Sequence, residues 1–248
     1  MTAVAAALGL VQARHLARHP WVLVGVGLAV LVMQYGLRGP EGNGLAALTQ
    51  AVPFYLGPAA FFAANLAASR DRRAGTSELV TASPTTSRRR ASGALLAVGG
   101  PVLLALGLVG AAGAAHWISG AGGPPRATVA DVASGPLVVC GGGLLGVATA
   151  YWAPFRTAPI LVMAGLVLWC QAGRMEWQLL TPYVEVPAAD AGARVPGSMA
   201  WHDLYLGCLA LLAATAALLA TPGPRRWLLI AGVVLAAGAA LAGWRQLP

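Results

Sequence analysis

Charge is scarce in this sequence of 248 residues, of which only 10% are Asp, Glu, Lys or Arg. An ordinary soluble domain carries about 25% charged residues, so there are too few here to cover a water-soluble globule of this size. Apolar and aromatic residues make up 58% of the chain, and the mean hydropathy is +0.70. The composition excludes a disordered, collagen-like or disulfide-stapled chain and predicts an integral membrane protein.

Lysine is missing altogether, so all 16 basic residues are arginines, against 8 acidic residues. A phosphate-binding G-x-x-x-x-G-K-[ST] loop is therefore excluded, and no H-E-x-x-H metalloprotease motif is present. Cysteine is also rare: Cys140, Cys170 and Cys208 all fall in apolar runs without a neighbouring His, which favours small core residues over a metal site. The excess of Arg, Ala and Gly is typical of a high-GC bacterial genome.

Seven apolar runs approach the roughly 17 to 25 residues that a helix needs to cross a bilayer. They cover residues 21–37, 45–68, 91–118, 135–153, 158–173, 204–220 and 227–244. We therefore predict an all-α fold, a polytopic transmembrane helix bundle of about seven spans. The fifth run is short and has Pro159 in its first turn, so a re-entrant segment remains an alternative there.

Residues 1–20 predict an N-terminal interfacial helix rather than a signal peptide, because the basic residues follow the apolar stretch instead of preceding it. Leu8, Val11, His15 and Arg18 share one helical face, and Pro20 breaks the helix before the first span. We expect Arg14, Arg18 and Trp21 to anchor it at the membrane surface. A frayed tail is the alternative.

The arginines predict the orientation of the bundle. With the N-terminus inside and seven alternating spans, five arginines lie outside: Arg38, Arg126, Arg174, Arg194 and Arg245. Eleven lie inside: Arg14, Arg18, Arg70, Arg72, Arg73, Arg88, Arg89, Arg90, Arg156, Arg225 and Arg226. The positive-inside rule favours this arrangement, which places the N-terminus in the cytoplasm and the C-terminus outside. The net charge of +8 is then a membrane-topology signal, and no nucleic-acid partner is expected.

Six of the inside arginines flank one loop, residues 69–91, between the second and third spans. Thr76 can cap a short helix that carries Glu78 in its first turn and ends before Pro84. A helix of two turns is marginal alone and gains stability by docking. Two interpretations stay open: a solvated loop whose arginines contact anionic lipid, or a coupling helix that docks in a cytoplasmic partner.

The loop reads Arg73-x-Gly75-Thr76-x-Glu78-Leu79-x-x-Ala82-x-Pro84-x-x-x-Arg88. This pattern resembles the first cytoplasmic loop of ABC-2 family permeases, the membrane subunits of type-2 ABC exporters. The N-terminal helix resembles their connecting helix, and the similarity covers roughly residues 10–220. Family members typically have six spans with both ends inside, so the additional C-terminal region at 221–248, which holds the seventh run, is a departure from the family pattern.

The resemblance implies a six-span permease core at 21–220 that has no ATPase site of its own. A separate ABC ATPase subunit, holding ATP and Mg²⁺, would drive it, and a second permease chain would pair with it in a bacterial inner membrane. The residues it assigns to docking the ATPase are Arg73, Gly75, Thr76, Glu78, Leu79, Val80, Pro84 and Arg88. On this interpretation Glu78→Arg or Glu78→Ala uncouples ATP hydrolysis from transport.

Few polar residues interrupt the spans, which favours an amphipathic or lipid-like substrate. Gly142 and Gly146 form a small-xxx-small pair, which predicts close helix packing, and Asn65 predicts an interhelical hydrogen bond. Residues 174–200 predict either an external gate helix or a plain loop. A non-transporting assembly or anchor subunit remains the alternative function; a secondary transporter is disfavoured because no acid lies well inside a span.

Overall fold

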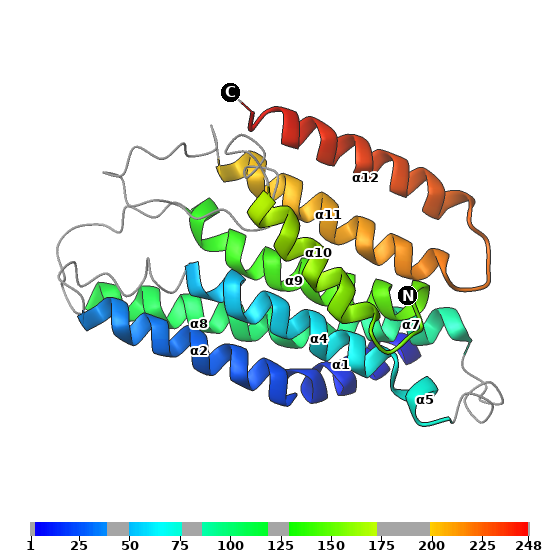
Figure 1. Ribbon diagram of the computed structural model, residues 1–248, viewed down its shortest axis with the longest axis horizontal. Helices are drawn as coiled ribbons and strands as arrows, with labels where there is room; N and C mark the ends of the chain where they lie inside the picture. The colour runs from blue at the N-terminus through cyan, green and yellow to red at the C-terminus, as the bar shows by residue number, and fades with distance from the viewer. Residues whose placement is uncertain (1–2, 39–49, 76–85, 119–128, 173–198, 248) are drawn as a thin grey trace.

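The computed structural model describes residues 3–38, 50–75, 86–118, 129–172 and 199–247, and every regular element in these ranges is a helix (Figure 1). The prediction of an all-α fold is confirmed for this part of the chain. The elements are α1 (Ala3–Ala17), α2 (Pro20–Arg38), η1 (Val52–Leu56, a π-helix), α4 (Gly57–Ala68), α5 (Arg70–Arg73), α7 (Ser87–Ala97), α8 (Gly99–Ile118), α9 (Val129–Trp152), α10 (Ala158–Ala172), α11 (Met199–Leu219) and α12 (Arg226–Trp244).

Four helices in the described ranges are long and apolar enough to cross a membrane: Ser87–Ala115, Val132–Trp152, Met199–Leu219 and Arg226–Trp244. The α1–α2 pair, bent by 55°, would add a fifth if it formed one broken span. Two shorter apolar helices, Val52–Ala68 and Ala158–Cys170, fall where the second and fifth spans are predicted. The described chain thus supplies four to five candidate spans and is consistent with a multi-pass membrane protein.

Helix α9 lies at the centre of the bundle, between α4 on one side and α11 on the other. Its contact with α4 is unusually close: a Cβ on Gly142 would lie 2.6 Å from the Gly57 carbonyl oxygen, and one on Gly146 would overlap that of Phe61. Helix α12 packs along the outer side of α11, whereas α10 makes only a small contact with α9 and α4. Backbone-to-backbone packing therefore joins α4 and α9 into one unit.

Helix α1 packs against α7 and α8. Gly93 lies against the Leu8 side chain and Gly100 against the Ala13 carbonyl, while Leu16 is buried. Val11, His15 and Arg18, predicted to share one face, are exposed. The chain bends directly after α1, and α2 begins at Pro20, as a proline at the first helical position allows.

The two ends of the bundle differ in their content of arginine. At one end, on the right in this view, lie α5, the start of α7, the α9–α10 turn and the α11–α12 loop. We call this the arginine-rich end, defined by Arg70, Arg72, Arg73, Arg88, Arg89, Arg90, Arg156, Arg225 and Arg226. The opposite end holds the C-terminus of α2, the starts of α9 and α11, and the end of α12.

Candidate functional site at the arginine-rich end

Within the predicted coupling loop, residues 69–91, the structure describes the two flanks. Thr76, Glu78, Leu79, Val80 and Pro84 lie outside the described residues, as do residues 174–198 of the predicted external segment 174–200. The flanks are residues 69–75, which follow α4, and residues 86–90, which open α7. Each flank is held by hydrogen bonds to segments far away in the sequence.

The first flank begins with a buried polar chain at the end of α4. The Asn65 side-chain amide donates to the Gly146 carbonyl on α9 at 3.1 Å, which confirms the predicted interhelical bond. The Ser69 hydroxyl donates to the Asn65 carbonyl at 2.7 Å and accepts from Arg73 Nε at 2.9 Å. Asn65 is only 2% exposed, and these bonds give its buried polar groups the partners that they need. They therefore fix the position at which α4 ends.

Two further features continue this flank. The Arg72 guanidinium reaches across to the Ala150 carbonyl, near the C-terminus of α9, where a cation also complements the helix dipole. After Arg73 the chain turns at Gly75, whose φ of +69° lies in the left-handed region that glycine enters without a Cβ penalty. Arg72 and Arg73 therefore face the bundle, and the chain leaves it at Gly75.

The second flank is tied to the α11–α12 loop. The Thr86 hydroxyl accepts from the Arg89 backbone N–H at 3.3 Å and caps α7. Both terminal nitrogens of Arg88 donate to the Pro224 carbonyl at 3.3 Å. Gly223 has a φ of +140°, and a Cβ there would lie 2.9 Å from Arg88 Nη1. Only glycine fits this turn, and the turn brings the Pro224 carbonyl within hydrogen-bond distance of Arg88.

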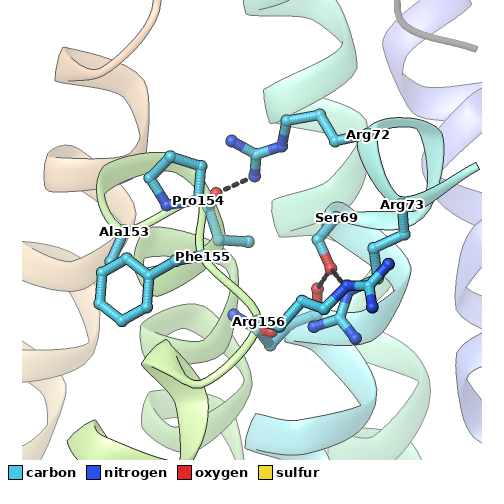
Figure 2. Close-up of a pocket in the computed structure, with 9 residues that line it drawn as sticks. Ser69, Arg72, Arg73, Ala153, Pro154, Phe155 and Arg156 are labelled. Atoms are coloured by element: carbon cyan, nitrogen blue, oxygen red, sulfur yellow. Dashed lines mark hydrogen bonds between the residues drawn. The ribbon is translucent and has the colours of Figure 1, made fainter. Parts of the chain in front are cut away.

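A cavity of about 130 Å³ opens between the first flank and the α9–α10 turn (Figure 2). Figure 2 shows Ser69, Arg72 and Arg73 on one side and the Ala153–Arg156 turn on the other. The described residues that line it are Asn65, Ser69, Arg72, Arg73, Ala150, Ala153, Pro154, Phe155 and Arg156. Three of these nine are arginines and none is acidic, so the cavity is suited to an anion.

A neutral bond joins α9 to α11 at the same end. The Trp152 indole N–H donates to the Ala216 carbonyl at 2.7 Å, although 62% of that side chain is exposed. An aromatic ring with a polar N–H at the end of an apolar helix is typical of a membrane–water boundary. The arginine-rich end therefore has the features of an interfacial layer.

The three predicted membrane anchors lie near the α1–α2 bend. Arg14 and Arg18 are exposed, and Trp21 is 49% exposed with its ring centroid 5.7 Å from that of Phe62 on α4. His19, at the bend, accepts from the Trp21 backbone N–H at 3.3 Å, and burial lowers the pKa of its imidazole. The bend is thus held locally by a neutral imidazole and an aromatic contact.

The cavity itself was missed by the sequence prediction. The predicted topology places Arg72 and Arg156 on the cytoplasmic side but assigns them no site, and it gives Ser69 no role beyond the start of the loop. The cavity joins residues 65–73 to residues 150–156, which are about 80 positions apart. The available signal was the basic residue in the Pro154-Phe155-Arg156 turn, which the predicted topology puts on the same side as the loop.

No group of three His, Cys, Asp or Glu side chains that could hold a metal lies within the described residues, and the three cysteines, all within those ranges, form no disulfide. No family model, curated protein or solved structure matches the chain. The fold and the site define the class: a helical protein of multi-pass membrane character with an arginine-rich end.

Proposed function

We propose that this chain is the permease subunit of an ABC-2 type exporter in a bacterial inner membrane, driven by an ATPase subunit that docks on loop 69–91. The observation that carries the proposal is the bracing of both loop flanks. Arg72 is bonded to α9 through the Ala150 carbonyl, and Arg88 is bonded to the α11–α12 loop through Pro224. A loop used only as a connection does not need such ties.

The bracing supports a mechanical role for the loop. A force on the loop reaches α4 and α9 through the first flank, and reaches α11 and α12 through the second. Because α4 and α9 touch backbone to backbone at Gly142 and Gly146, they move as one body and do not slide. ATP-driven closure of the partner subunits would thereby switch the bundle between inward-facing and outward-facing arrangements.

The proposed topology has seven spans with the arginine-rich end in the cytoplasm. At 1.5 Å per residue, the 17 residues of Val52–Ala68 reach about 25 Å, near the lower limit for crossing a hydrocarbon core. Helix α10 is shorter and would rely on interfacial residues such as Trp152 and Phe155 at its cytoplasmic side. ATP and Mg²⁺ belong to the partner, a second permease chain completes the transporter, and the substrate is amphipathic or lipid-like.

Co-purification tests this proposal. The chain, extracted from its native membrane in mild detergent, should bring with it a subunit that carries a G-x-x-x-x-G-K-[ST] loop and hydrolyses ATP. In the reconstituted complex, Arg88→Gln should lower transport per ATP hydrolysed, whereas Arg89→Gln, the same charge change on a neighbouring residue, should not. Glu78→Arg should uncouple more completely. A chain that purifies without any ATPase, under conditions that preserve its own fold, contradicts the proposal.

A further inference from the structure

The arginine-lined cavity between α4, α5 and the α9–α10 turn has a use separate from docking an ATPase. We propose that it binds the phosphate of an anionic phospholipid headgroup from the cytoplasmic leaflet. The lining combines three guanidinium groups with the Ser69 hydroxyl and the Asn65 amide, and it contains no carboxylate among the described residues. Phosphate oxygens are the acceptors that this set of donors matches.

The donor count leaves capacity for a ligand. A guanidinium has five N–H donors, of which Arg72 uses an Nη2 donor on the Ala150 carbonyl and Arg73 uses Nε on Ser69. These bonds hold the two arginines in fixed positions while their other nitrogens stay near the cavity (Figure 2). Asp71, on the same short helix, is exposed and does not line the cavity. The site is therefore basic and preorganised.

The dimensions also fit a polyatomic anion. A single water needs about 10–15 Å³ of such space, whereas this cavity offers about 130 Å³. Its lining includes the buried side chains of Asn65 and Ser69 and the exposed Arg156, so the cavity reaches from the protein interior to the surface. A headgroup phosphate can enter from the surface while its glycerol stays outside.

The surroundings favour a lipid over a soluble phosphate. Phe155, which lines the cavity, is 53% exposed, and Ile160 and Leu161 in the first turn of α10 are exposed apolar residues directly beyond the turn. An acyl chain lying on α10 would keep its headgroup at the level of the cavity. Basic pockets between transmembrane helices on the cytoplasmic side are known to suit anionic headgroups.

Lipid titration of the delipidated chain in a neutral detergent, followed by native mass spectrometry, tests the proposal. The probes are phosphatidylglycerol and phosphatidylcholine, with inorganic phosphate as the soluble competitor. We expect preferential binding of phosphatidylglycerol, weakened about tenfold by Arg156→Gln through the loss of a charge-assisted hydrogen bond. The matched control is Arg70→Gln, which removes an exposed charge outside the cavity and should bind like the wild type.

A second variant separates the cavity from surface charge. Ala153→Leu keeps every arginine but fills part of the space, and it should also weaken phosphatidylglycerol binding. Thermal unfolding without lipid should match the wild type for Arg156→Gln and Arg70→Gln, so that loss of binding is not loss of fold. Agreement of all these results supports the site.

Four outcomes would overturn the proposal. If Arg156→Gln and Arg70→Gln weaken phosphatidylglycerol binding equally, the lipid is attracted by the general surface charge. If phosphatidylglycerol and phosphatidylcholine bind equally, the cavity does not select the anionic headgroup. Displacement of the lipid by inorganic phosphate at similar concentration identifies a soluble anion as the ligand. Loss of ATPase association in Arg156→Gln with unchanged lipid binding assigns the cavity to the protein partner.

Discussion

The two ends of this bundle are held together by different chemistry. At the arginine-rich end, Arg72 and Arg88 cross between helices to bond the carbonyls of Ala150 and Pro224. At the opposite end, a buried pair joins α11 to the residues just after α12: His202 Nδ1 lies 2.8 Å from Gln246 Oε1, and both residues are at most 3% exposed. The ties at the first end are made by arginines, whereas the tie at the other end is made by two buried side chains.

The packing of α9 also differs between the two ends of the bundle, because its glycines meet backbone atoms toward one end and side-chain atoms toward the other. Toward the arginine-rich end, Gly142 and Gly146 meet the α4 backbone, which cannot move aside. Toward the opposite end, Gly135 faces the Val52 side chain, and a Cβ added to Gly135 would lie 3.2 Å from Val52 Cγ1. The arginine-rich end is therefore both the charged end and the more closely packed one.

The largest contrast that we predict is one of topology. Helix α12 runs between the two ends, so cysteines placed at Arg225 and Arg245 should report opposite sides of the membrane. In a background without the three native cysteines, a membrane-impermeant thiol reagent added to intact cells should label Arg245→Cys and leave Arg225→Cys unlabelled until the cells are opened. Labelling of both positions from the same side would contradict the seventh span, and the two ends would then not lie on opposite sides of the membrane.

The next largest effect concerns the rigid contact. Gly146→Ala places a methyl on the Phe61 carbonyl and should destabilise the chain by about 3 kcal/mol, because overpacking against backbone cannot relax. Gly135→Ala, which meets a side chain, should cost about 1 kcal/mol or less. Gly141→Ala on the same helix is the control, since its Cβ would sit at an ordinary 3.8 Å from Ala210. Unfolding by denaturing detergent measures all three, and equal losses would show that α9 is packed uniformly.

How far the sequence predicted the structure depends on the range of the interaction. Composition and run length predict a helix at each of the seven apolar runs, and the described part of every run contains one. The prediction succeeds because a bilayer requires each segment to satisfy its own backbone hydrogen bonds, which is a local condition. A local chain break is predicted as well: Pro20 ends the N-terminal helix and opens α2. These signals lie within a few residues of the feature that they specify.

Contacts between distant segments were harder to predict. The small-xxx-small spacing identified Gly142 and Gly146 as packing positions but did not say that α4 faces them. Nothing in the sequence near Arg72 or Arg156 shows that they share a cavity, because their separation depends on how α4 and α9 cross. The same holds for His202 and Gln246, which are 44 positions apart and meet at 2.8 Å.

Breaking the buried tie between His202 and Gln246 should have an intermediate effect. Gln246→Ala removes a hydrogen-bond partner of a histidine that is 1% exposed and should cost about 1–2 kcal/mol, nearly independent of salt. A double-mutant cycle with His202→Ala should return a coupling of about 1 kcal/mol. His15→Ala, at an exposed position on α1, serves as the control. Coupling that vanishes would mean that α12 is held by apolar contact alone.

The smallest effect on stability should come from the charged tie. The bond between Arg88 and Pro224 is exposed, so Arg88→Gln should cost about 0.5 kcal/mol at low salt and less at high salt, where surface charges are screened. Arg89→Gln supplies the matched baseline. A contribution to stability this small, combined with the loss of coupling proposed above, would mean that Arg88 transmits force without holding the fold. A large, salt-independent loss would instead make Arg88 a structural residue and erase the difference between the two ends.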